Sequence, residues 1–232
     1  MFQELKGLFR GPRTEPNGIG PSSGRQVIRS PFAGRGSNPV VSARGSRGLE
    51  EFFTYIRDTT GLTILDLGGA NQQNVSFITG LGHRLYSENF LQILNDTFGM
   101  EDTADQSNPG QIEYFLKQTL DYEDGYFDGV LIWDVLEYMS PALLSAVVER
   151  LHRIVRGKGY MLAFFHADSK LEAVPYYTFR IQEVKTLEVT QSGLRRPAQL
   201  HNNRSVEKLF GKFESVKFFL TKEQLREVIV KA

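Results

Sequence analysis

The sequence predicts an α/β fold, in which a doubly wound, mainly parallel sheet of seven strands carries helices on both faces. The first observation is that, from about residue 48 onward, short apolar runs typical of buried strands alternate with stretches of helical periodicity. The second is that the chain ends in two strand-like runs, SVKFFL and REVIVKA, joined by TKEQL. That ending is typical of an antiparallel pair, so we expect an antiparallel C-terminal edge.

The composition narrows the class of protein. The chain has 232 residues, of which 41% are hydrophobic and 23% charged, as in ordinary globular proteins. It contains no cysteine, which excludes disulfides and thiolate metal sites and fits a reducing, cytoplasmic location. No stretch approaches the roughly 20 apolar residues of a membrane span, so no transmembrane segment is expected.

Charge and composition divide the chain into two parts. Residues 1–48 contain eight Lys or Arg and only two Asp or Glu, together with many Gly, Pro and Ser. Such a segment buries too little apolar surface to fold alone, so residues 1–47 are predicted to be a disordered basic tail. A solvated tail is the simplest interpretation, and docking to an acidic surface, RNA or a membrane is the alternative. Residues 48–232 are predicted to form the folded domain.

The first half of that domain is predicted as follows. Leu49, Phe52, Phe53 and Ile56 fall on one helical face, and the strand LTILDL follows them. A helix from about Asn74 leads to a second strand, HRLYSE, and then to the helical stretch FLQILNDTF. The run IEYFLKQTL fits either a helix or a strand, and the seven-stranded sheet uses it as the third strand.

The second half has clearer signals. FDGVLIWD is a buried strand, and SPALLSAVVERLHRIV is a helix with Ser140 as N-cap and Pro141 at its first position. The strand YMLAFF follows the turn RGKG. After His166, the alternation in YYTFRIQEVKTLEVTQSG predicts a hairpin, so residues 167–203 are an insertion after strand five. SVEKLFGKF is the last helix.

The stretch TILDLGGANQQN, residues 63–74, is the strongest functional signal. A glycine turn at the end of a parallel strand lets the backbone come within contact distance of a ligand at the sheet edge. Glu88 follows Gly68 by twenty residues, at the tip of the second strand, where a carboxylate can bind the two hydroxyls of a ribose. From Gly68 the chain reads GGANQQ, which lacks the later glycines of a pyrophosphate-binding turn, so a nucleoside ligand without a pyrophosphate is favoured.

Four motifs in order resemble those of class I S-adenosylmethionine-dependent methyltransferases. ILDLGGA looks like the first motif of that family, and YSEN looks like its post-motif acid. FDGVLIWDVLEYM resembles the fourth-strand motif, and LHRIVRGKGYMLAFF the turn into strand five. The likeness covers residues 48–166 and 204–232, and it implies S-adenosyl-L-methionine as the cofactor.

The resemblance also implies roles for individual residues. Asp66 would organise the turn near the methionine amino group, and Glu88 would bind the ribose hydroxyls. Trp133 and Asp134, at the tip of strand four, would face the methionine part and the acceptor. The remaining cofactor-binding positions that the likeness implies are Gly68, Gly69 and Ala70 under the cofactor and Asn89 near the adenine.

The sequence departs from the family pattern in three places. Ala70 replaces the second glycine, and Tyr138 stands where many small-molecule members have a histidine. The third strand of the family ends at a residue that contacts the adenine amino group. The register here offers Phe115, Leu116 or Lys117, so that contact is unassigned.

Structural roles remain open for several of these residues. Asp66 could cap a turn, Glu88 could be an exposed charge, and Trp133 could be a core aromatic. The catalytic candidates are His166, directly after strand five, together with Asp134 and Tyr138, although a lone histidine is more often structural. The last set is Arg195, Arg196, His201 and Arg204, which could grip an anionic substrate or lie at a solvated hairpin tip.

Three functional hypotheses follow. The first is a methyltransferase for a small-molecule acceptor, with the hairpin as a lid whose Tyr176, Tyr177 and Phe179 line the pocket. The second is an RNA or protein methyltransferase that uses the basic N-terminal arm. The third is a non-catalytic S-adenosylmethionine-binding protein. No metal site is expected, because the four histidines (His83, His152, His166, His201) show no metal-ligand spacing.

Overall fold

The computed structural model describes residues 41–99, 105–168, 170–219 and 225–232. Residues 1–40 of the basic arm in the second hypothesis therefore lie outside the described part of the chain. The described chain forms a six-stranded sheet in the order β3-β2-β4-β5-β9-β8 and a three-stranded sheet in the order β1-β7-β6. No described helix has the length and apolarity to cross a membrane.

The main sheet is mostly parallel, as predicted. Strands β2 (Thr63–Asp66), β3 (Arg84–Ser87), β4 (Phe127–Trp133) and β5 (Val155–His166) run parallel to one another. The predicted antiparallel C-terminal pair is also confirmed: β9 (Leu225–Lys231) pairs antiparallel with both β5 and β8 (Ser215–Phe219). The carboxyl ends of β2, β3, β4 and β5 therefore meet at one edge of the sheet.

The prediction of seven strands is wrong, because the segment offered as the third strand is helix α4 (Pro109–Thr119). Asn108 is its N-cap, with a side-chain oxygen that accepts from the backbone N–H of Gly110 and Gln111, and proline occupies the first turn. Phe115 is buried against Phe90, with their ring centroids 4.9 Å apart. Residues 115–117, which the register offered for the adenine contact, therefore lie within a helix and not at the end of a strand.

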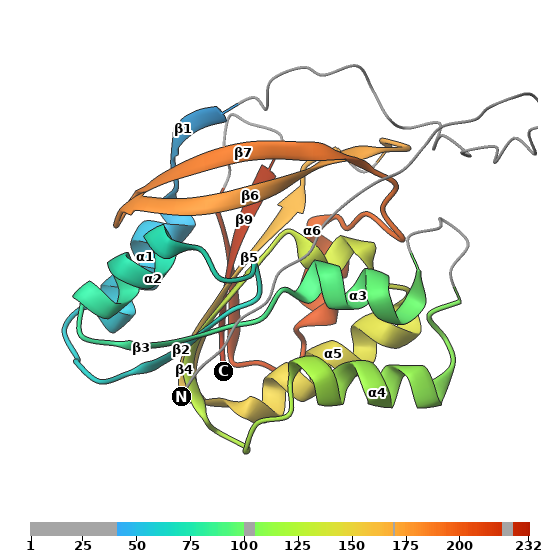
Figure 1. Ribbon diagram of the computed structural model, residues 1–232, viewed down its shortest axis with the longest axis horizontal. Coiled ribbons are helices and arrows are strands. Elements are labelled where there is room, and N and C mark those ends of the chain that lie inside the picture. Colours follow the sequence, from blue (N-terminus) through green and yellow to red (C-terminus); the bar gives the residue numbers. More distant parts are fainter. Residues whose placement is uncertain (1–40, 100–104, 169, 220–224) are drawn as a thin grey trace, which may run out of the picture. The chain divides into compact units, whose positions relative to one another are not determined.

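Side chains of the central strands pack alternately into two hydrophobic cores, one on each face of the main sheet. In β4, Val130 and Ile132 point to one core, and Leu131 and Trp133 to the other. Helices α1 (Arg47–Ile56) and α2 (Gln72–Gly80) cover the second face (Figure 1). The first face is covered by α3 (Phe90–Phe98), α4, α5 (Pro141–Ile154) and α6 (Asn203–Leu209).

The smaller sheet packs over the second core. Strands β6 (Val174–Glu183) and β7 (Thr186–Arg195) form an antiparallel hairpin, and β1 (Val41–Gly45) pairs antiparallel with β7. Phe179, Ile181, Leu187 and Val189 of the hairpin are buried in that core. Figure 1 shows this sheet along the top of the view, above α1 and α2. Residues 41–45 of the expected tail are thus part of a sheet.

Candidate functional site

The glycine turn and the post-motif acid are joined through the backbone. Gly68 and Asn89 form an isolated β-bridge, and the N–H of Gly69 donates to the carbonyl of Glu88 at 3.0 Å. Gly69 has φ +85°, a left-handed conformation that glycine adopts without strain. The end of β2 and the end of β3 are therefore locked side by side at the carboxyl edge of the sheet.

Asp66, the last residue of β2, is fully buried and organises this turn. Its Oδ1 accepts from the N–H of Gly68 at 2.8 Å and from Nε1 of Trp133 at 2.6 Å. Its Oδ2 accepts from Nδ2 of Asn74 at 2.9 Å. Burial raises the pKa of Asp66, and the hydrogen bonds from Trp133, Asn74 and Gly68 oppose that rise.

Trp133 occupies the space directly above the turn. A Cβ atom added at Gly68 would lie 2.8 Å from Cδ1 and Nε1 of the indole, so only glycine leaves room for the ring. The indole is 1% exposed, and it stacks on Phe179 of the hairpin with ring centroids 5.0 Å apart and planes 7° apart. Trp133 has φ 60°, an uncommon value for a residue with a side chain. It connects the turn to the hairpin.

Glu88 is half-buried beside the turn, and one of its oxygens is occupied. Oε1 accepts a hydrogen bond of 2.6 Å from the hydroxyl of Tyr122, which lies between α4 and β4. Burial and this contact raise the pKa of Tyr122, so the phenol stays protonated and keeps donating. The carboxylate of Glu88 is thereby held in one orientation.

A cavity of about 190 Å³ lies at this edge of the sheet. One wall comes from the turn and the start of α3, and the other from the end of β4 and from strand β6. Its lining residues are Leu67, Gly68, Asn89, Leu91, Trp133, Asp134, Val135, Tyr176, Tyr177, Thr178 and Phe179. The three aromatic residues predicted to line the pocket from the hairpin are all among them.

Asp134 follows β4 and is 3% exposed. Its Oδ2 accepts from the backbone N–H of Tyr177 at 3.2 Å, which ties the end of β4 to the hairpin. Burial raises the pKa of Asp134 to about 7, and the nearby charge of His166 limits that rise. A carboxyl group that titrates near neutral pH and lines a cavity can exchange a proton with a ligand.

His166, at the end of β5, is completely buried, and both of its ring nitrogens are engaged. Nδ1 lies 2.6 Å from Oε2 of Glu137, and Nε2 lies 3.0 Å from the carbonyl oxygen of Pro175. Burial lowers the pKa of His166, but the hydrogen bond and the charge of Glu137 outweigh this, and the net shift is upward. This geometry suits an imidazolium that anchors the start of β6 rather than a base open to a ligand.

The other predicted positions are more scattered. Tyr138 lies in the short 3-10 helix η1 (Val135–Tyr138) and is 2% exposed, with the guanidinium of Arg195 5.0 Å from its ring centroid. Burial raises its pKa, so it stays a neutral phenol. Ala70 and Asn89 are exposed at the rim, and Asn89 also caps α3 by accepting from the N–H of Gln92.

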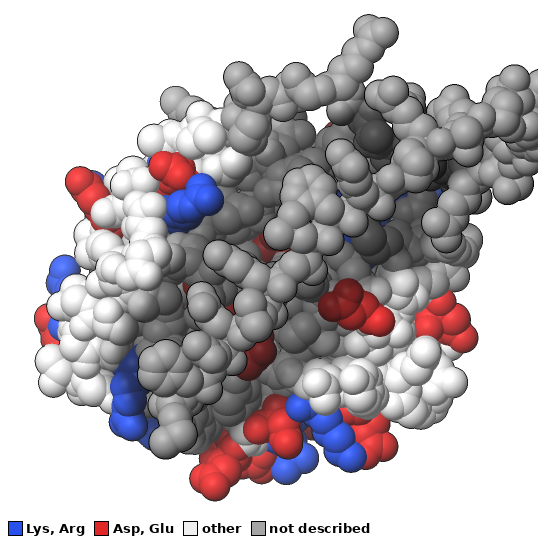
Figure 2. Space-filling model, in the orientation of Figure 1, with Lys and Arg blue, Asp and Glu red and all other residues white. Residues whose placement is uncertain are grey.

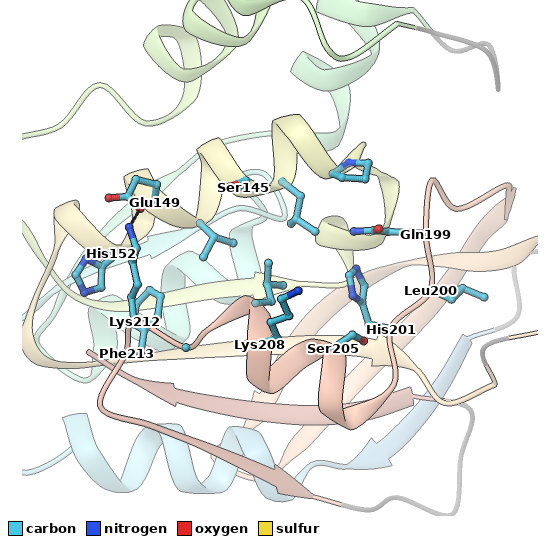
Figure 3. A pocket seen from close by; sticks show the side chains of 15 residues that line it. Ser145, Glu149, His152, Gln199, Leu200, His201, Ser205, Lys208, Lys212 and Phe213 are labelled. Carbon is cyan, nitrogen blue, oxygen red and sulfur yellow. Dashed lines mark hydrogen bonds and ion pairs between the residues drawn. The ribbon is translucent and has the colours of Figure 1, made fainter.

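The four residues expected to grip an anion differ in exposure. Arg195 is half-buried and donates to Oδ1 of Asn95 at 2.7 Å, whereas Arg196 and Arg204 are exposed. His201 is 5% exposed. His201 lines a larger cavity of about 620 Å³ between α5 and α6, where its ring and Lys208 extend from the α6 side toward α5 (Figure 3).

Sequence comparisons find no relative for this chain: no protein-family model matches it, and no curated protein sequence matches it. Solved structures with a similar fold do exist. One is a methyltransferase of Methanosarcina mazei described as dependent on S-adenosylmethionine (12% identity, 77% of this chain, 94% of that chain, TM-score 0.46). A second, so described, comes from Archaeoglobus fulgidus (14%, 79%, 91%, TM-score 0.46).

A third is the 1,6-didemethyltoxoflavin-N1-methyltransferase of Burkholderia thailandensis, solved with bound S-adenosylhomocysteine (13%, 80%, 75%, TM-score 0.44). All three neighbours are described as methyltransferases. Their identities and TM-scores are too low for a ligand or a reaction to be transferred to this chain.

Three residues of the site were missed from the sequence. Tyr122 holds Glu88, Glu137 holds His166, and Asn74 joins Asp66 to the hairpin. Each contact brings together residues from different elements, so local spacing carries no signal for it. Only for Glu137 did the sequence contain a signal: a charged residue inside the apolar run VLEYM requires a buried partner.

Proposed function

We propose that the chain is an S-adenosylmethionine-dependent methyltransferase that acts on a small-molecule acceptor. The observation that carries the proposal is the backbone lock between the glycine turn and the post-motif acid. Gly69 bonds to the carbonyl of Glu88, so a close-approach turn and a carboxylate stand together at the carboxyl edge of parallel strands. This combination suits a nucleoside that carries a ribose diol but no pyrophosphate.

The residues fit this cofactor, but the described conformation leaves it too little room. Asp66, the turn and Glu88 supply the expected groups. The cavity of about 190 Å³ is smaller than the roughly 300–1,000 Å³ of typical small-molecule pockets. The indole of Trp133 lies against Gly68 and fills part of the space that the cofactor would need. Binding therefore requires Trp133 and the hairpin stacked on it to move away from the turn.

When bound, the cofactor supplies a methyl group already activated on a positively charged sulfur. The chain then needs to align the acceptor and exclude water, and alignment of this kind is worth on the order of 7–11 kcal/mol. The hairpin performs the exclusion, because β6 covers the cavity with Tyr176, Tyr177 and Phe179. Enclosure by a packed strand favours a small acceptor over a macromolecule.

Binding of S-adenosylhomocysteine tests this proposal. We expect saturable binding by calorimetry, with a change in tryptophan fluorescence, because the single tryptophan of the chain must leave the turn. Glu88→Ala should weaken binding by about 1–3 kcal/mol, the usual loss for hydrogen bonds to a charged group. Glu207→Ala, an exposed carboxylate on α6, is the matched control and should bind like the wild type.

Equal binding by the wild type and Glu88→Ala would contradict the site assignment. Tight binding without methyl transfer to any fraction of a metabolite extract would instead favour the non-catalytic alternative. The small volume of the cavity lined by Trp133 is the specific observation that favours that alternative.

A further inference from the structure

We propose that the cavity between α5 and α6 binds a small organic carboxylate, with its apolar body along α5 and its carboxylate beside Lys208 and His201. This cavity shares no lining residue with the smaller one at the carboxyl edge of the sheet. The inference is therefore independent of the proposed function. It depends on the size of the cavity, on its apolar walls and on the polar groups at each end.

The cavity has the size of a small-molecule site. Its volume of about 620 Å³ lies within the roughly 300–1,000 Å³ of typical ligand pockets. Its lining residues on α5 run from Pro141 to His152, a distance of about 16 Å at 1.5 Å per helical residue. An elongated ligand with a body of several carbon atoms fits such a space.

Both walls of the cavity contain apolar side chains. Leu144 and Val148 lie one turn apart on the face of α5 that lines it. Leu209, the last residue of α6, and Phe213, which follows that helix, line the same cavity. Removal of apolar surface from water favours the binding of an apolar body here. An inorganic anion gains nothing from these walls.

The polar groups differ between the two ends of the cavity (Figure 3). At one end Lys212 forms an ion pair with Glu149, so their charges cancel. Lys208 and His201 lie at the other end. Among the described residues, no ion pair includes Lys208, whose ammonium group is therefore available to an anion. One unneutralised cation matches the single charge of a carboxylate.

His201 adds a hydrogen-bonding group to this end. Its carbonyl oxygen accepts from Nη1 of Arg226 at 2.9 Å, and its ring packs against Phe165 with centroids 5.6 Å apart. The residue is thus held in place, yet its buried Nε2 has no hydrogen-bond partner within the described chain. Burial lowers the pKa of His201, against the opposing charge of Glu137, so the ring is a neutral imidazole.

A carboxylate suits both groups at this end. A neutral imidazole can donate one hydrogen bond, and a bond to a charged acceptor is stronger than one to a neutral acceptor. The ammonium group of Lys208 supplies the opposite charge. A pocket lined mainly by apolar groups, with few polar groups at one end, also fixes the direction in which a ligand enters.

The test compares probes that separate charge from apolar body. Octanoate, its neutral analogue octanamide, and inorganic phosphate are titrated into the full chain by calorimetry. We expect octanoate to bind about tenfold more tightly than octanamide, and phosphate to show no saturable binding in the same range. Lys208→Met should reduce the preference for octanoate about threefold. Lys185→Met, at an exposed lysine between β6 and β7, is the matched control and should leave the preference unchanged.

A second variant tests the location. Ser145 is exposed on α5 and lines the cavity, so Ser145→Trp should fill it and abolish octanoate binding without lowering the urea midpoint. Octanoate binding that survives this substitution overturns the site. Equal affinity for octanoate and octanamide, binding of neither, or phosphate binding as tight as that of octanoate overturns the ligand class. A dimer that Ser145→Trp disrupts, without octanoate binding, would assign the cavity to a second copy of the chain and overturn the inference.

Discussion

Asp134 couples stability to pH through its burial. Its pKa is raised to about 7, so the folded state favours the protonated carboxyl, whereas an unfolded aspartate ionises near 3.9. Between these values the folded state binds more protons than the unfolded state, and the free energy of unfolding falls as pH rises.

We expect Asp134→Asn to remove this fall. Relative to the variant, the wild type should lose stability between about pH 4 and pH 7, by up to about 4 kcal/mol, and the difference should level off above pH 8. Urea unfolding at pH 5 and pH 8 measures it. His166 and Glu137 remain in both proteins, so the difference reports mainly on Asp134; a pH-independent difference would mean that Asp134 titrates normally.

Single residues show clearly what could be predicted from the sequence. The order Asp66, Gly68 and Gly69 is local, and Glu88 lies one helix further along, so the spacing alone predicted that these residues would meet. His166 was predicted as a possible base because it follows strand five, but its function depends on Glu137, 29 positions away, and on Pro175. Sequence can suggest that a titratable side chain is near an edge, but not which of its atoms are already bonded.

At the scale of elements, the side-chain amide of Asn74 in α2 makes the backbone hydrogen bonds to β6 that a neighbouring strand would otherwise make. Its Oδ1 accepts from the N–H of Ile181 at 2.8 Å, and its Nδ2 donates to the carbonyl of Phe179 at 3.3 Å. The same Nδ2 donates to Asp66. One amide therefore links the glycine turn, α2 and the hairpin.

Asn74→Ala should loosen the hairpin selectively. The substitution leaves buried polar groups on β6 and Asp66 without their partner, at about 1–3 kcal/mol for each. Hydrogen exchange should speed up in peptides from β6 more than in peptides from β4 or β5. Asn108→Ala, which removes the cap of α4, is the matched control and should affect α4 instead. Uniform acceleration over the whole chain would argue against a local link.

The helix at Pro109–Thr119 shows why one element was mispredicted. The run IEYFLKQTL mixes apolar and polar residues in an order that fits either period, so the pattern alone was undecided. The deciding signal stood just before it: asparagine followed by proline is a helix start. The family likeness favoured a strand there, and local capping chemistry proved the better guide.

At the scale of the whole described chain, Glu227 ties the two sheets and a helix together. It lies on β9, accepts from Arg44 of β1 at 3.0 Å and from the N–H of Gly48 of α1 at 2.6 Å, and is completely buried. On the described part of the face in Figure 2, acidic and basic side chains are interspersed. Among the ion pairs of the described residues, most lie at exposed positions. The pair of Arg44 and Glu227 is different because both side chains are buried.

Arg44→Met should therefore destabilise the fold by about 3–5 kcal/mol, because it leaves a buried carboxylate without its cation. Arg57→Met, at an exposed ion pair, should change stability by less than about 1 kcal/mol. Deletion of residues 1–40 keeps Arg44 and should leave the urea midpoint near that of the full chain, whereas deletion through residue 45 should lower it strongly. Equal midpoints for the two deletions would contradict this assignment.

Because α4 takes the place of a third strand, β3 has a ladder partner on one side only within the described sheet, namely β2. Glu88 thus follows the edge strand of the sheet, held by backbone hydrogen bonds to Asp66 and Gly69 and by the hydroxyl of Tyr122. Local opening of β3 would weaken the contact that we propose between Glu88 and a ribose, without unfolding the rest of the sheet. The hydrogen bond between Tyr86 of β3 and Tyr126, whose hydroxyls are 2.6 Å apart, restrains β3 and would then tune affinity at a distance from any ligand.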